Sequence, residues 1–198
     1  MKKTLLVSLL LVVFLGFSFA GPFGIEMGQS LSDLQKNGLE PTQIENNLGY
    51  YSVSPKYTHP EFERYLVRID EDEGVFFIKG IGKDISDNGY GTSTKARFDK
   101  LRKSIEGTYG KSELLSVLFP NSIWDEPEDW MMGLRKSERL HLAYWEKKDG
   151  ATFPGEIGEI YLSANATSSS NGYLALEYYG KKHEELSEKA NQLAAQVF

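Results

Sequence analysis

The sequence has no cysteine. Disulfide bonds, which brace many exported proteins, are therefore excluded, and the hydrophobic core alone must hold the fold. An N-terminal lipid anchor of the bacterial lipoprotein type is excluded as well, because that anchor is attached to a cysteine. The chain must reach its stability, and any attachment to a membrane, by other means.

Long apolar runs are also scarce, and the one that exists lies at the N-terminus. Leu5 to Phe17 follows the basic pair Lys2 and Lys3 and leads into small residues that end at Ala20. This pattern predicts a secretory signal peptide over residues 1–20, cleaved after Ala20. The run is shorter than the ~20 residues that span a bilayer. We therefore expect a periplasmic or secreted protein with no stable membrane anchor after cleavage.

Basic residues are outnumbered by acidic ones, 22 against 28, so the formal net charge is −6. Without Lys2 and Lys3 the balance is 20 against 28. Nucleic acids and anionic lipids attract clustered Lys and Arg, so we expect no nucleic-acid partner and instead expect another envelope or secreted protein. Residues 21–198 are predicted to form a single domain, with two fused halves joined near 111–122 as the alternative.

Hydrophobic periodicity predicts the elements of this domain. The best-defined unit has a strand around 65–69, a turn over 70–74, a strand over 75–81 and a helix over 94–109. Further helices are predicted over 31–37, 126–136 and 183–197, and further strands over 50–53, 139–147, 159–166 and 173–179. The type of segment 112–119 stays open. Short loops between the last strands favour an antiparallel meander. The prediction is an α+β fold, with one antiparallel sheet or two small sheets and amphipathic helices packed on one face.

Several patterns resemble cofactor or metal sites and fail on inspection. Asp84 to Gly89 resembles the front of a calcium-binding EF-hand loop, but Lys95 stands where the bidentate glutamate belongs. A turn that leads into a helix needs the same residue types. Gly110-Lys111-Ser112 resembles the end of a phosphate-binding loop, but Ile105 replaces its first glycine. The three histidines, His59, His141 and His183, are far apart in sequence. We expect no cofactor and no metal.

A second cluster of carboxylates is flanked by Trp124 and Trp130. Its members are Asp125, Glu126, Glu128 and Asp129. Two carboxylates across a cleft, with tryptophans to stack on sugar rings, would suit a glycosidase. A purely structural interpretation also accounts for this cluster, with acidic residues at the start of a helix and tryptophans in the core. An envelope hydrolase acting on glycan or peptide is therefore kept as an alternative function.

Aromatic residues offer the clearest recognition signal. Side chains alternate along a strand, so Tyr178 and Tyr179 must point to opposite faces, as must Tyr144 and Trp145. Exposed Tyr and Trp often anchor protein interfaces. The candidate binding residues are Trp124, Trp130, Tyr90, Trp145 and Tyr179. They favour a non-enzymatic protein-binding module of the inhibitor, immunity or assembly accessory type. A small-ligand carrier, which needs an apolar pocket between sheet and helix, is a further alternative.

Five short motifs resemble an uncharacterised family of bacterial exported proteins. They are Gly21 to Gly28, His59 to Tyr65, Tyr90 to Thr92, Tyr109 to Lys111 and Trp130 to Arg139. The resemblance spans most of the mature chain and implies no particular activity. Met27 to Ser30, followed by strands, is also similar to the small helix-plus-antiparallel-sheet modules of envelope assembly lipoproteins and β-lactamase inhibitor proteins. The missing cysteine separates this chain from the lipoproteins.

Overall fold

The structure is a computed structural model that describes residues 21–45, 49–146 and 153–195. The predicted signal peptide lies outside these residues. The helices are η1 (Pro22–Gly24), α1 (Leu31–Lys36), α2 (Thr92–Tyr109), η2 (Pro127–Asp129), α3 (Trp130–Arg135) and α4 (His183–Ala195). The strands are β1 (Thr42–Gln43), β2 (Tyr50–Val53), β3 (Phe62–Asp70), β4 (Gly74–Gly82), β5 (Ile85–Ser86), β6 (Glu113–Leu118), β7 (Arg139–Glu146), β8 (Ile157–Ser168) and β9 (Asn171–Gly180).

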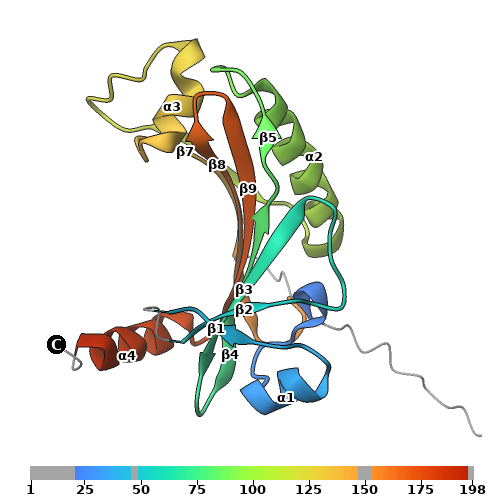
Figure 1. Cartoon of the computed structure of the whole chain (residues 1–198). Coiled ribbons are helices and arrows are strands. Elements are labelled where there is room, and N and C mark those ends of the chain that lie inside the picture. The colour runs from blue at the N-terminus through green and yellow to red at the C-terminus, as the bar shows by residue number, and fades with distance from the viewer. Residues whose placement is uncertain (1–20, 46–48, 147–152, 196–198) are drawn as a thin grey trace, which may run out of the picture.

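All nine strands form one antiparallel sheet, so the alternative of two small sheets is wrong. The order is β1-β2-β3-β4-β9-β8-β7-β6, and β5 pairs with the start of β9. Two meanders, β1 to β4 and β6 to β9, therefore meet where β4 pairs with β9. Figure 1 shows the sheet as a curved layer, with α2 on one side and α4 projecting from the other.

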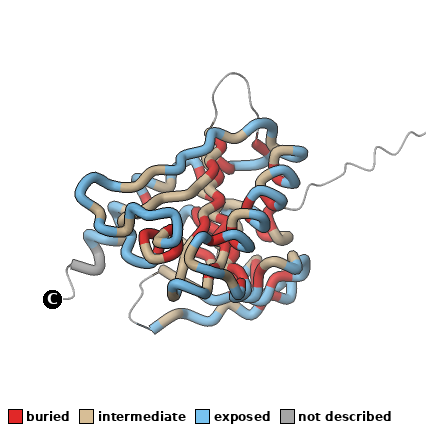
Figure 2. Tube along the Cα trace, turned by 90° about the horizontal axis from the view of Figure 1, so that it is seen from above, coloured by how far each residue is buried: buried red, intermediate tan, exposed pale blue. Residues whose placement is uncertain are grey.

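The main hydrophobic core lies between the sheet and helices α1, α2 and α3. Ile160 and Leu162 of β8 pack there with Phe98 of α2, Met131 of α3 and Leu34 of α1, and each of these side chains is fully buried. Figure 2 shows the buried residues gathered at the centre of the molecule, with exposed residues around them. The apolar stripe of α2 thus faces the sheet, as its periodicity predicts.

Helix α4 packs on the other side of the sheet, which differs from the expectation that all helices share one face. Its Leu186 is buried against Phe76 and Phe77 in a second, smaller cluster. The cause is local, because β9 ends at Gly180 and α4 begins only three residues later, at His183. The chain therefore folds back over the face on which Tyr179 lies, while Tyr178 belongs to the main core.

Most predicted elements are confirmed, and two are refined. Segment 112–119 contains strand β6 at the edge of the sheet. The predicted helix over 126–136 is divided into the 3₁₀ turn η2, which starts at Pro127, and the short helix α3. Within the described residues, no helix has both the length and the apolar composition needed to cross a membrane.

Candidate functional site

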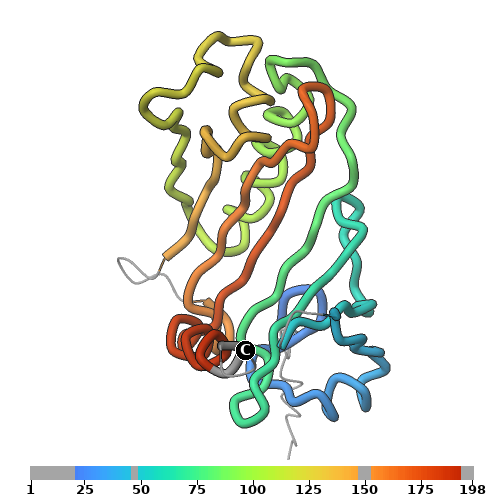
Figure 3. Tube along the Cα trace, turned by 60° about the vertical axis from the view of Figure 1, so that its left-hand side comes forward, coloured from blue at the N-terminus to red at the C-terminus, as the bar shows by residue number. Residues whose placement is uncertain are grey.

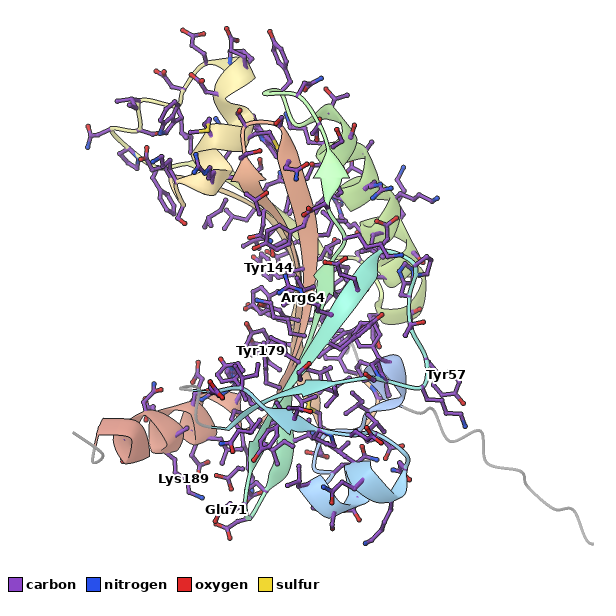
Figure 4. All side chains as sticks on the ribbon, viewed as in Figure 1. Tyr57, Arg64, Glu71, Tyr144, Tyr179 and Lys189 are labelled. Atoms are coloured by element: carbon purple, nitrogen blue, oxygen red, sulfur yellow. The ribbon has the colours of Figure 1, made fainter. Side chains whose placement is uncertain are left out.

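The sheet has one face that helices α1 to α3 leave uncovered, and we call it the open face. On β8 this face carries Glu159, Tyr161, Ser163 and Asn165, which are all partly exposed. They alternate with buried residues such as Leu162, which point into the main core. Figure 4 shows Tyr144 and Tyr179 on the concave side of the curved sheet. The open face is therefore a concave surface and, among the described helices, only α4 covers it, at one end.

Aromatic rings form a continuous row across this surface, which we call the tyrosine row. Its members are Tyr144 of β7, Tyr161 of β8, Tyr179 of β9 and His183 of α4. The ring centroids of Tyr144 and Tyr161 are 6.1 Å apart, and those of Tyr161 and Tyr179 are 5.4 Å apart. His183 stacks on Tyr179 with a centroid distance of 4.3 Å. Strand pairing sets these spacings, because Tyr144 is directly opposite Tyr161 in the register.

A glutamate accepts a hydrogen bond from each tyrosine hydroxyl of the row. Tyr144 donates to Glu113 at 2.5 Å, on the neighbouring edge strand. Tyr161 donates to Glu159 at 3.0 Å, two residues earlier on the same strand.

The third tyrosine has a partner of the same kind. Tyr179 donates to Glu177 at 2.7 Å, and Glu177 also forms an ion pair with Lys79 at 2.6 Å. Hydrogen bonds to a charged acceptor are stronger than those to a neutral one, so the rings are held in fixed orientations.

The same contacts keep the hydroxyls protonated. Burial raises the pKa of Tyr161 to about 12, with the hydrogen bond to Glu159 and its negative charge adding to the effect. Burial, then the charge and hydrogen bond of Glu177, also raises the pKa of Tyr179. Burial, followed by the nearby Arg68 charge, lowers the pKa of His183. At neutral pH Tyr161 and Tyr179 are therefore protonated phenols, and His183 is a neutral imidazole.

A hollow of about 500 Å³ lies at the α4 end of the row. Three carboxylates line it, those of Glu146, Glu159 and Glu184, together with Tyr179 and His183. Its one lysine, Lys181, forms an ion pair with Glu156 at 2.9 Å. Acidic groups beside aromatic rings are suited to receiving a cationic side chain, through charge and through cation–π contact.

Two of the five residues proposed for binding from the sequence are buried in the core and are therefore not on the surface. Trp130 is 5% exposed and Trp145 is 2% exposed. Gly91 makes room for Trp130, since a β-carbon at Gly91 would collide with the indole ring. Trp145 donates its indole N–H to the carbonyl of Gly110 at 2.9 Å, which satisfies its one polar atom.

The other three proposed residues reach the surface to different degrees. Tyr179 lies in the tyrosine row and is partly exposed. Tyr90 is 50% exposed in the loop before α2, and Trp124 is half-buried in the loop after β6. Neither Tyr90 nor Trp124 is on a strand of the open face, so the structure does not unite the predicted residues into one site.

The carboxylates proposed for hydrolysis lie in the segment that leads into α3. Asp125, Glu126 and Glu128 are exposed to solvent. A glycosidase acid needs an apolar setting that keeps it protonated, and bulk water does not provide one. Among the described residues, no group of three or more His, Asp or Glu is placed to hold a metal ion.

Sequence reasoning missed Tyr161, His183 and the glutamate partners of the row. A signal for Tyr161 was present, since β8 alternates polar and apolar residues from Glu159 to Asn165, which predicts one uncovered face. Comparison of the chain with protein-family models, with curated proteins and with solved structures finds no match.

Proposed function

We propose that this protein is an exported, non-enzymatic binding module of the bacterial envelope, of the inhibitor, immunity or assembly accessory type. It engages another protein through the open face of its sheet. One observation carries the proposal, namely a concave sheet face, free of helices over most of its area, on which carboxylates fix a row of aromatic rings. Fixed aromatic side chains bind with little loss of conformational entropy.

Charge indicates the kind of partner surface. The open face carries Glu113, Glu146, Glu159 and Glu177, and its strands β3 and β4 contribute the cations Arg64, Arg68 and Lys79. Acidic residues outnumber basic ones there, as they do in the whole chain. Complementary charge speeds association and excludes wrong partners, so the partner is expected to present basic and aromatic side chains.

Site-specific photo-cross-linking tests this proposal. A photoreactive residue in place of Ser163 sits at the middle of the open face, whereas the same residue in place of Lys100 sits on the exposed side of α2. In the native envelope, the Ser163 position should give an adduct with one protein and the Lys100 position should not. Equal adducts from both positions, or none from Ser163, would contradict the proposal.

Tyr161→Ala provides the matching affinity measurement once the partner is isolated. Loss of a central aromatic anchor costs about 2 kcal/mol or more, which is roughly a 30-fold weaker Kd. Lys100→Ala is the control and should leave Kd unchanged. Circular dichroism of the Tyr161→Ala variant separates lost binding from lost folding, and an unchanged Kd in a folded variant would count against the open face.

The small-ligand carrier receives less support. The hollow beneath α4, of about 310 Å³, is lined by Arg68, Asp70, Glu71, Asp72 and Lys189, among others. An apolar ligand would remove these charged groups from water and give them no hydrogen bond in exchange, which costs free energy. The hydrolase alternative depends on exposed carboxylates and gains no support from their surroundings.

A further inference from the structure

In the described part of the chain, strand β6 forms one edge of the sheet and pairs with β7 alone. Figure 3 shows this yellow-green segment along the outer side of the strands. Proteins usually protect such an edge with lysine, proline or a bulge, because its unpaired backbone groups attract another strand. Residues Glu113 to Leu118 contain neither lysine nor proline, and their register with β7 has no irregularity. This edge is therefore open to pairing.

Exposed apolar side chains gather at the same edge. Six large hydrophobic residues of the described chain are exposed, and four of them lie on β6 or just after it. These four are Leu114 at 47%, Leu115 at 41%, Phe119 at 41% and Ile123 at 75% exposed. A concentrated apolar patch on a soluble protein marks a surface that another chain covers.

The backbone of β6 shows which groups face outward. The N–H of Phe119 donates to the carbonyl of Glu138 at 2.7 Å, one step beyond the pair Leu118 and Arg139. Hydrogen-bonded and non-hydrogen-bonded pairs alternate along an antiparallel ladder. The N–H and C=O groups of Leu114, Ser116 and Leu118 therefore point away from β7, toward the free edge.

The side chains of β6 match a second copy of the same strand. If two β6 strands pair antiparallel about Ser116, Leu115 is opposite Val117 and Leu114 is opposite Leu118. Apolar residues then meet apolar residues on both faces of the sheet. The two Glu113 carboxylates lie about 20 Å apart, at 3.4 Å per residue, so they do not repel each other strongly. In this register Leu114 is opposite Leu118 and Ser116 is opposite its own copy. The backbone N–H and C=O groups that point toward the free edge therefore face each other and can form hydrogen bonds.

We propose that two copies of this chain associate through β6, antiparallel and centred on Ser116. The two-fold axis is perpendicular to the sheet and passes between the two Ser116 residues. Both open faces therefore lie on the same side of the joined sheet. Two nine-stranded sheets become one continuous sheet that carries two tyrosine rows. The inference does not depend on the proposed function, because it rests on the edge strand and not on the open face.

A cysteine substitution tests both the contact and its register, since the chain has no cysteine of its own. In Ser116→Cys the two new thiols belong to directly opposed residues, with α-carbons about 5.5 Å apart, within disulfide range. Leu114→Cys is the matched control, since its thiols would be about 14 Å apart along the strand. Mild oxidation of the protein purified from its host should link Ser116→Cys into a dimer and leave Leu114→Cys unlinked.

Light scattering after size-exclusion chromatography provides the second measurement. The unmodified protein should show twice the mass of one chain at micromolar concentration. Leu115→Lys should halve that mass, while Tyr57→Lys, which removes a large exposed side chain in the loop before β3, should not. A monomer at all concentrations, a dimer in the folded Leu115→Lys variant, or cross-linking of Leu114→Cys in place of Ser116→Cys would overturn the proposal.

Discussion

Individual side chains on the open face are polar at their tips and aromatic in their bodies. Tyr161 illustrates the consequence, because its ring lies between Tyr144 and Tyr179 while its hydroxyl donates to Glu159. Such a residue can contact an apolar or a cationic group without changing its conformation. The same environment raises the pKa of the Tyr161 hydroxyl, and this raised pKa can be measured.

We predict that Tyr161→Phe removes one phenol that ionises with a pKa of about 12. Tyrosinate absorbance, recorded after a rapid pH jump and before alkaline unfolding, measures the loss. Glu159→Gln should instead shift this ionisation to lower pH, because the charge that opposes the phenolate is gone. If Tyr161→Phe leaves the amplitude around pH 12 unchanged, the hydroxyl does not have this environment.

Helix α2 depends on a residue that the calcium-like pattern singled out. The carboxylate of Asp87 accepts backbone N–H groups from Asn88, Ser93 and Thr94, at 2.8, 3.0 and 2.6 Å. Burial would raise the pKa of Asp87, but the hydrogen bonds from Thr94, Asn88 and Ser93 outweigh it and hold the pKa below its ordinary value. The loop is thus a cap for a helix that carries the fully buried Phe98.

We predict that Asp87→Ala lowers the free energy of unfolding by about 1 to 2 kcal/mol, the usual cost of losing a helix cap. Urea denaturation at neutral pH measures this. Because the folded pKa is below the unfolded one, the contribution is present above the ordinary Asp pKa and is lost as pH falls through the folded value. The deficit of the variant should therefore shrink in strong acid. Asp87→Asn, which keeps one acceptor oxygen, should lose less than Asp87→Ala.

The molecule as a whole holds a partly buried histidine on each side of its sheet. His141 lies against Phe98 and Trp130, with ring centroids 4.4 and 5.5 Å away, and burial lowers its pKa. Nearby Lys95, Arg102 and Arg139 lower it further, while Asp99 opposes them.

His183 is the counterpart on the open face. Burial lowers its pKa, Arg68 adds to the effect, and Glu184 and Glu177 oppose it. Both imidazoles are therefore neutral in the folded protein over a range of pH in which the unfolded chain already binds protons.

We predict that acidification weakens the fold in the range where histidine titrates. The folded pKa values are lowered, so stability falls as pH drops through the unfolded value of about 6.5 and levels off below the folded values. Thermal unfolding between about pH 7.5 and 5.5 measures this, and the combined variant His141→Gln and His183→Gln should flatten the profile. His59→Gln is the control, in a loop before β3. A profile as steep in the combined variant as in the parent would contradict the prediction.

Much of the fold follows from local rules that act over a few residues. The two-residue alternation around Tyr65, the turn at Asp70 to Gly74 and the apolar stripe of α2 each define an element, and all three are confirmed. The same alternation places Tyr178 and Tyr179 on opposite faces. Periodicity thus determines which residues share a face, because the backbone geometry of a strand or helix is independent of its surroundings.

The site required information that no local pattern contains. Whether a face of the sheet is covered depends on where helices distant in sequence pack. Helix α4 packs on the face on which Tyr179 lies. Trp130 and Tyr161 illustrate this, since both are aromatic and only packing decides that the first fills the space beside Gly91 while the second remains partly exposed. The strand order likewise leaves β6 at an edge. Long-range burial, which depends on the sum of many weak contacts across the chain, determined which of these aromatic residues, alike in sequence, remain exposed.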